Sequence, residues 1–168
     1  MTHIIVSLKV QQLVIKETIM SDWANDIYMM HNKFGVRDWF EANKDNKELM
    51  RKYLMFRALM CQEELSETLT AINNGDAEEI VDGLIDLCVF AIGTLDVFGV
   101  DANAAWDRVY EANMAKEPGI KPGRPNPFGL PDLLKPGGWQ GPSHEGNHGD
   151  FEKALDVIPQ PKPDTGWV

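Results

Sequence analysis

Proline is missing from the first 117 residues of this 168-residue chain, and all ten prolines lie between Pro118 and Pro163. Nine of the fourteen glycines also lie beyond residue 116. Because proline breaks the interior of a helix, its absence leaves the first two thirds of the chain free to form long helices. We therefore predict an N-terminal extension (1–20), a helical domain (21–116) and an extended, irregular C-terminal arm (117–168).

The chain also lacks an excess of positive charge and a long apolar run. Sixteen Lys and Arg stand against 26 Asp and Glu, which gives a formal net charge of −10. A surface that binds DNA or RNA needs clustered cations, so we expect no nucleic acid polymer as a partner. A small phosphate ligand remains compatible with this charge, because divalent cations reverse the local potential. No apolar run reaches the roughly 18 residues of a membrane span, so we expect no membrane partner.

Cysteine is scarce, and the two that occur, Cys61 and Cys88, have neither CxxC nor metal-ligand spacing. We interpret both as small core residues of a cytoplasmic protein. His144 and His148 stand in the polar run 143–150. We interpret that run as a flexible loop rather than a metal site.

The region before the first proline contains residues that typically begin or end helices. Ser21, Asp76 and Asp101 are suitable N-caps, while Gly35 and Gly75 are suitable helix ends. Together with apolar periodicity, these residues predict helices over 22–34, 47–73, 77–98 and 102–115, a short helical piece over 36–43 and a helical turn over 150–156.

The apolar periodicity of these helices predicts how they pack. We expect two inward faces, formed by Leu54, Ala58, Cys61, Leu65, Leu69 and Ile72 in one helix and by Ala105, Val109 and Ala112 in another. The helix over 77–98 is apolar nearly all round, so we expect it to be buried against a second subunit as well. The sequence thus predicts an all-α bundle of four to five helices that forms a homo-oligomer, with a Pro- and Gly-rich arm.

Two acidic clusters lie on the two longest predicted helices, separated by the turn at Asn74–Gly75. In an antiparallel hairpin with this turn, Glu67 lies level with Asp82, and Glu63 lies level with Asp86. Spacings of three, four and seven residues keep each cluster on one helix face. The sequence therefore predicts four to six carboxylates around one small volume.

Gathered carboxylates repel one another unless a cation lies between them. Hard oxygen ligands in such number favour Mg²⁺ or Mn²⁺, and the absence of His or Cys at ligand spacing disfavours zinc. The alternative is an acidic face in contact with water. Asp86 lies in an otherwise apolar helix, where an unpaired charge is costly, and we consider it as a residue behind the ligands.

These clusters resemble the signature of the all-α nucleotide pyrophosphatases, the MazG-like proteins that include phosphoribosyl-ATP pyrophosphohydrolase-like phage proteins. The family's ExxE and ExxD motifs correspond to Glu64–Glu67 and Glu79–Asp82, with eleven residues between them. Two further segments resemble the phage branch of the family, His31–Gly35 (HNKFG) and Asn113–Lys116 (NMAK). The segment Lys135–Trp139 (KPGGW) bears a loose resemblance to the family's Pro- and Gly-rich ending.

The resemblance implies a metal-dependent hydrolase that converts a nucleoside triphosphate into the monophosphate and pyrophosphate. It assigns Mg²⁺ or Mn²⁺ to Glu64, Glu67, Glu79 and Asp82, and it gives Glu63 a role in binding or orienting a metal-bound water. We hypothesise that Glu63 or Glu67 takes the proton from the attacking water. The resemblance also implies a dimer-based assembly, often a tetramer formed as a dimer of dimers.

Binding the substrate requires cations for the phosphates and a stacking surface for the base. We assign the phosphates to Lys116 with Asn113 on the same side of the helix end, and secondarily to Arg57. A stacking Phe34 with His31 or Asn32 at the base edge would suit a purine, such as that of dGTP or GTP. In the phage branch of the family, the substrates are deoxynucleoside triphosphates.

Two alternatives remain open from the sequence. One is a dUTPase of the dimeric all-α type, which uses similar carboxylates. The other is a non-enzymatic helical oligomerisation module whose acidic patch binds cations or a basic partner.

Overall fold

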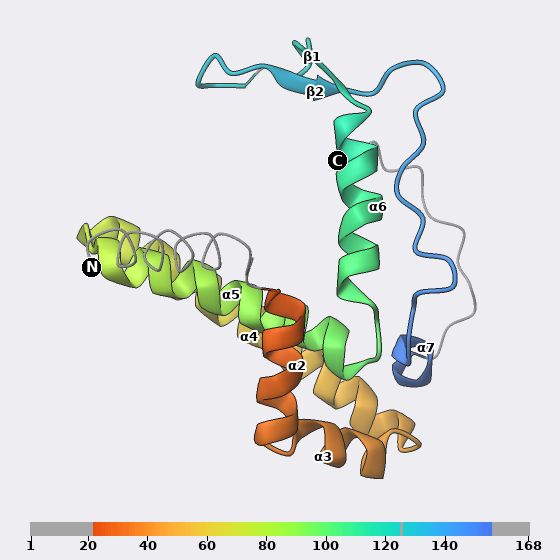
Figure 1. Cartoon of the computed structure of the whole chain (residues 1–168). Coiled ribbons are helices and arrows are strands. Elements are labelled where there is room, and N and C mark those ends of the chain that lie inside the picture. The colour runs from red at the N-terminus through yellow and green to blue at the C-terminus, as the bar shows by residue number, and fades with distance from the viewer. Residues whose placement is uncertain (1–21, 125, 156–168) are drawn as a thin grey trace, which may run out of the picture.

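The structure is a computed structural model that describes residues 22–124 and 126–155, so the predictions for residues 1–21 and for the end of the arm lie outside the described residues. The described part is mostly helical, as predicted for an all-α protein (Figure 1). Its elements are α2 (Trp23–Lys33), α3 (Val36–Asn43), α4 (Lys47–Asn74), α5 (Ala77–Val97), α6 (Ala102–Met114), β1 (Glu117–Gly119), β2 (Asp132–Leu134) and α7 (Phe151–Ala154).

Side-chain caps set the helix boundaries. Asp22, rather than the predicted Ser21, caps α2, because its carboxylate accepts a hydrogen bond from the Asn25 N–H at 3.3 Å. Asp76 accepts from two N–H groups of the first turn of α5, and Asp101 accepts from the Ala104 N–H. Gly75 ends α4 with φ 71°, a left-handed conformation that glycine adopts without a steric penalty. The predicted turn between α4 and α5 is therefore confirmed.

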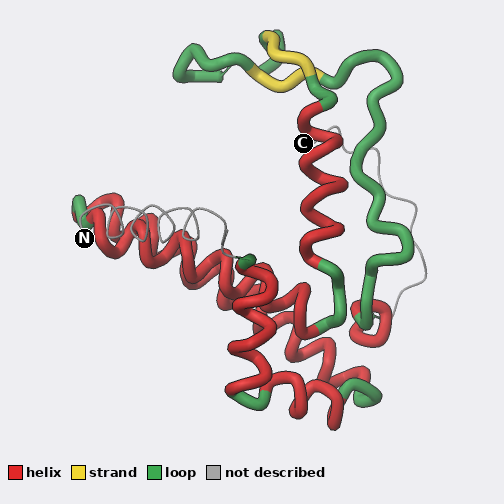
Figure 2. Tube along the Cα trace, in the orientation of Figure 1, coloured by secondary structure: helices red, strands yellow, loops and turns green. Residues whose placement is uncertain are grey.

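The α4–α5 hairpin is the central element of the described structure. Helices α2 and α3 pack at its open end, opposite the turn between α4 and α5 (Figures 1 and 2). Two buried glycines of α5, Gly83 and Gly93, meet α4. A Cβ at Gly93 would lie 2.6 Å from Nη2 of Arg57, which is closer than a Cβ approaches an atom to which it is not bonded. Close helix approach thus depends on the absence of side chains at these two positions.

The inward face predicted for α4 is wrong at Ala58, which is exposed, and in the second half of the helix. Leu65, Leu69 and Ile72 are about half exposed, and the side chains buried there are Thr68 and Ala71. The reason is that the close approach at Gly83 admits only small side chains between the helices. The larger apolar residues therefore lie on the outer face of the hairpin.

The core lies where α4 begins and α5 ends. Its buried members are Phe40, Met50, Val97, Phe98 and Ala154. The Phe98 ring meets Phe40 edge-on at 5.1 Å and stacks on Phe151 at 4.7 Å between centroids. Phe151 and Ala154 belong to α7, so the predicted helical turn near residue 150 is confirmed and supplies part of the core.

The arm is more ordered than the predicted irregular chain. Antiparallel β1 and β2 pair Glu117 with Leu134, and the chain then returns alongside α6 (Figure 2). Arg108 of α6 donates to the carbonyls of Ser143 and Glu145 on this returning segment.

The polar run 143–150 is not the loose loop that its composition indicates. The Asn147 side chain exchanges two hydrogen bonds of 2.9 Å with the backbone of Asp101. A Cβ at Gly149 would lie 2.1 Å from the Phe98 carbonyl oxygen, and the Asp150 N–H donates to that same oxygen at 2.6 Å. These contacts fasten the arm to the end of α5.

Helix α6 projects away from the hairpin, and it has no buried residue (Figure 1). The predicted inward residues Ala105, Val109 and Ala112 are half-buried rather than buried. Ala105 and Val109 line an apolar groove of about 1020 Å³ between α5, α6 and the arm. No single helix of the described residues is long and apolar enough to cross a membrane, although α5 and α6 together pass that test and are bent by 116°.

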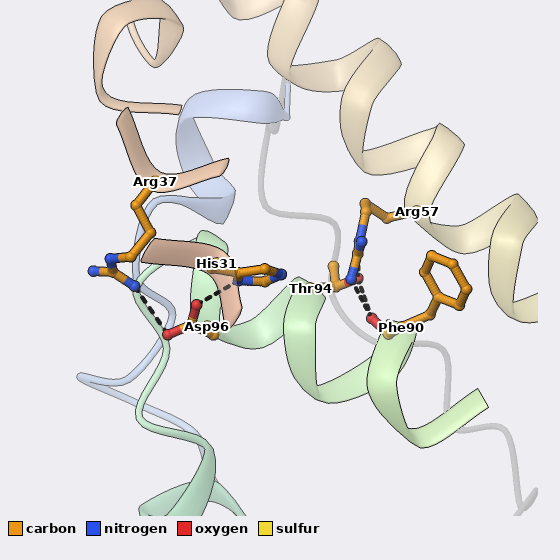
Figure 3. A network of polar contacts seen from close by, with 6 residues as sticks. All are labelled: His31, Arg37, Arg57, Phe90, Thr94 and Asp96. Atoms are coloured by element: carbon orange, nitrogen blue, oxygen red, sulfur yellow. Dashed lines mark hydrogen bonds and ion pairs between the residues drawn. The ribbon is translucent and has the colours of Figure 1, made fainter. Parts of the chain in front are cut away.

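A network of polar contacts joins α2, α3 and α4 to the second half of α5 (Figure 3). Asp96 accepts from His31 Nδ1 at 2.6 Å and from Arg37 Nη1 at 2.9 Å. Arg57 donates to the Thr94 hydroxyl at 3.1 Å and to the Phe90 carbonyl at 3.0 Å. These bonds satisfy groups that would otherwise be buried without partners.

We predict that Gly93→Ala lowers the free energy of unfolding by about 1–2 kcal/mol, because the new methyl group displaces Arg57 from its buried hydrogen bonds. This loss outweighs the roughly 1 kcal/mol by which alanine favours a helix over glycine. Chemical denaturation measures the difference. Ala91→Ser, at an exposed site on the same helix, is the control and should stay within about 0.5 kcal/mol of wild type. A stabilised Gly93→Ala protein would show that Arg57 does not limit the helix approach.

Candidate active site

The two acidic motifs lie face to face across the hairpin. A Cβ at Gly83 would lie 2.5 Å from Thr68 Oγ1 and 3.5 Å from the Glu64 carbonyl oxygen, so Gly83 is seated against the turn of α4 from Glu64 to Thr68. This turn contains ExxE, and Gly83 directly follows the Asp82 of ExxD. The register predicted from the turn position is thereby confirmed.

Electrostatics identify Glu64 as the centre of the acidic cluster. Partial burial raises the pKa of the Glu64 carboxyl above its usual range. Repulsion from Asp86, Glu67, Glu63 and Asp82, in decreasing order, raises this pKa further. Four carboxyls of the predicted cluster therefore act on Glu64, and ionisation of Glu64 is disfavoured in the folded protein.

Asp86 has a larger effect on the Glu64 pKa than we expected from its predicted position behind the metal ligands. It is half-buried like Glu64, and it raises the Glu64 pKa more than Glu67 or Asp82 does. The sequence signal for this was available, because Asp86 lies one helical turn after Asp82 in an apolar helix.

The remaining carboxylates of the cluster are accessible from solvent. Glu63, Glu67, Glu79 and Asp82 are exposed. Within residues 22–124 and 126–155, no three His, Cys, Asp or Glu side chains lie close enough together to hold a metal ion. The donor set is nevertheless chemically suited to a hard divalent cation, since all its ligand atoms are carboxylate oxygens.

Arg57 has a structural environment rather than a ligand-binding one. It is buried between α4 and α5, with its guanidinium 4.9 Å from the Phe90 ring centroid and its two hydrogen bonds made to α5. Burial lowers its pKa from the usual value. The sequence assigned Arg57 to phosphate, and the structure does not bring it to the acidic cluster.

The three candidate base-binding residues do not share one environment. His31 is buried and bonded to Asp96, whereas Asn32 is exposed and Phe34 is 66% exposed at the far end of α2. The Lys33 ammonium lies 5.2 Å from the Phe34 ring centroid. A stacking role thus remains sterically open to Phe34, while His31 serves the contact of α2 with α5.

The candidate phosphate ligands at the end of α6 do lie together. The Lys116 ammonium donates to the Asn113 side-chain oxygen at 2.9 Å and lies 5.2 Å from the Trp139 ring centroid. Sequence reasoning assigned no role to Trp139 or to Lys135, whose ammonium lies 4.7 Å from the same centroid. The Lys135–Trp139 segment was the only signal for them.

The region that contains both acidic motifs also matches a known family. Residues 36–113, from α3 almost to the end of α6, match the family model described as phosphoribosyl-ATP pyrophosphohydrolase. The matched family belongs to the MazG-like all-α superfamily, and the mostly helical structure is consistent with that fold. The family implies pyrophosphohydrolase activity in general. No curated protein and no solved structure gives a match to the chain.

For this MazG-like domain we predict that Glu64→Gln raises the unfolding temperature at pH 7 when divalent metal is removed. The folded protein holds the Glu64 pKa above its unfolded value, so the ionised carboxylate favours unfolding at neutral pH. The stability difference between variant and wild type should shrink as the pH falls through the folded pKa and vanish below the ordinary carboxyl pKa, where Glu64 is protonated in both states. Thermal unfolding followed by circular dichroism measures it.

Glu78→Gln is the matched control for this stability measurement. Glu78 lies in the first turn of α5, where a negative charge stabilises the helix, so its neutralisation should not raise the unfolding temperature. A metal-free Glu64→Gln protein that is less stable than wild type at pH 7 would contradict the electrostatic account of the cluster.

Proposed function

We propose that this protein hydrolyses a nucleoside triphosphate to the monophosphate and pyrophosphate, using Mg²⁺ or Mn²⁺ held by the carboxylates of α4 and α5. The observation that carries the proposal is the seating of Gly83 against the Glu64–Thr68 turn, which aligns ExxE with ExxD. Proteins of the MazG-like superfamily generally use divalent metals, and the hard oxygen donors here suit them.

The residues that would hold metal are Glu64, Glu67, Glu79 and Asp82, with Asp86 behind them, one helical turn after Asp82. Bound metal would neutralise phosphate oxygens and lower the pKa of a bound water. The protein's own contribution is position, because the helix register fixes which carboxylates face the phosphates. Glu63 and Glu67 are both exposed, and either can take a proton from water, Glu67 when the other carboxylates hold the metal.

The substrate class within this proposal is a purine deoxynucleoside triphosphate or its ribose counterpart, such as dGTP or GTP. Phe34 offers an exposed ring for stacking, and Asn32 offers an exposed amide. A pyrophosphate-release assay across purine and pyrimidine triphosphates, with and without Mn²⁺, tests the proposal. Preference for dUTP would favour the dimeric dUTPase type, and no release with any nucleotide would favour a non-enzymatic module.

We expect Glu64→Gln and Asp82→Asn, each made separately, to reduce pyrophosphate release by more than about 100-fold. Even groups that only support metal ligands cost 10–100-fold when removed, so loss of a ligand should cost more. Glu78→Gln is the control, because it removes an acidic group of α5 outside the motifs and should retain activity. If either motif variant folds and releases pyrophosphate at the wild-type rate, the assignment of the site is wrong.

The same proposal includes a homo-oligomer built as a dimer of dimers. The outer face of the hairpin presents Leu65, Leu69 and Ile72 from α4, each about half exposed, and Val81 at 63% exposure from α5. Apolar surface of this kind gathered over two helices favours association with another subunit. In addition, α6 projects away from the α4–α5 hairpin, and Lys116 follows two residues after the end of α6 (Figure 1).

We predict that multi-angle light scattering gives about 76 kDa, four times the chain mass of 18.9 kDa, or about 38 kDa for the dimer. Replacing Leu69 and Ile72 together by Lys should shift the mass to that of one chain, because charges on the outer face cannot be desolvated. Lys replacement of Met29, an apolar residue of α2 that is 59% exposed, is the control and should leave the mass unchanged. A monomeric wild-type protein would contradict the proposed assembly.

A further inference from the structure

Two lysine ammonium groups lie near one indole ring beside the end of α6. Lys116 Nζ lies 5.2 Å and Lys135 Nζ lies 4.7 Å from the Trp139 ring centroid. The indole N–H donates to the Ala112 carbonyl at 2.7 Å, which fixes the ring to the last turn of α6. The two cations are therefore held by the same anchored side chain.

The strand register brings the two lysines together from distant parts of the chain. Glu117 pairs with Leu134, so Lys116 immediately before β1 and Lys135 immediately after β2 flank the same end of the two-stranded sheet. Because each nitrogen lies within 5.2 Å of one centroid, the two nitrogens lie within about 10 Å of each other. Their proximity results from folding of the arm and not from neighbouring positions in sequence.

The contacts of both ammonium groups in the described part of the chain are with neutral groups. Lys116 donates to the Asn113 amide oxygen, and both lysines face the Trp139 ring. Two like charges at this separation repel each other, while the chain as a whole has a net charge of −10 and many carboxylates. Among the described residues no carboxylate pairs with either lysine, and two cations held together in this way are arranged for binding an anion.

We propose that Lys116, Lys135 and Trp139 form the binding site for the phosphate chain of the nucleoside triphosphate, which makes Lys135 a substrate-binding residue. This inference rests on the proposed function. A di- or triphosphate carries several negative charges in a row, and each ammonium group offers three N–H donors. Trp139 positions the cations through its ring, and Asn113 orients the Lys116 ammonium. The unit is too small for a nucleic acid polymer, which needs cations distributed along a surface.

The place of this unit in the fold determines which carboxylates it serves. Helix α6 directs it away from the acidic half of the α4–α5 hairpin of the same chain (Figure 1). The carboxylates that it complements therefore belong to a second copy in the proposed oligomer. The arm is thus part of the active site rather than a cover over it.

The test is titration of the full-length protein with inorganic tripolyphosphate by calorimetry, without divalent metal. Lys135→Met and Lys116→Met should each weaken tripolyphosphate binding at least tenfold, and Lys135→Arg should retain it. Lys52→Met is the control, because this lysine is exposed and pairs with Glu48 on α4, so binding should be unchanged. The affinity of the wild-type protein should fall with added salt.

Steady-state kinetics separates this inference from the proposed function. Lys135→Met should raise KM for the nucleotide at least tenfold, whereas Glu64→Gln should abolish pyrophosphate release and leave tripolyphosphate binding intact. Wild-type tripolyphosphate affinity and KM in Lys135→Met would overturn the two-lysine site while hydrolysis still stands. A protein that releases no pyrophosphate, yet loses tripolyphosphate binding on Lys135→Met, would keep the anion site and reject the hydrolase.

Discussion

Close contact between α4 and α5 at two glycines is the constraint on which the other features depend. Gly83 brings the α5 backbone against the Glu64–Thr68 turn, and Gly93 brings it against Arg57 and His31. With both helices this near, their relative height is fixed at two separate points. One rigid pair of helices therefore positions both the carboxylates at the first point and the polar network at the second. A catalytic site requires such fixed positions of its side chains.

The same contact determines what faces outward. Only small or slender side chains fit between the helices at Gly83, so the large apolar residues of α4 lie outside this contact and are about half exposed. The many apolar residues of α5 thus serve both the contact within the hairpin and an apolar outer face. A long hairpin with two apolar sides is stable in water only when its outer side is also covered.

Local sequence signals predicted the helices well, because caps and turns act over three or four residues. Asp76, Gly75 and Asp101 mark boundaries that the structure confirms. The prediction of which face of α4 is buried was wrong, because periodicity cannot distinguish a face that packs within the chain from one that stays exposed. The glycines that determine the buried face lie on another helix. The register of the acidic motifs was predicted correctly from the turn alone. The roles of Gly149, Asn147 and Trp139 were missed, because each depends on a contact with a residue at least 27 positions away.

Ala154 is a core residue that is 1% exposed, although it lies 56 residues after Phe98 in the chain. This separation has a consequence for biosynthesis. Helices α2 to α5 make mostly local contacts and can form while the chain is still being translated. The core beside Phe98 stays open until the arm has emerged and returned, a delay on the order of several seconds at ordinary elongation rates. During that interval the hairpin exposes both its unfinished core and its apolar outer face, so the nascent chain is a candidate for chaperone binding before its last segment closes the fold.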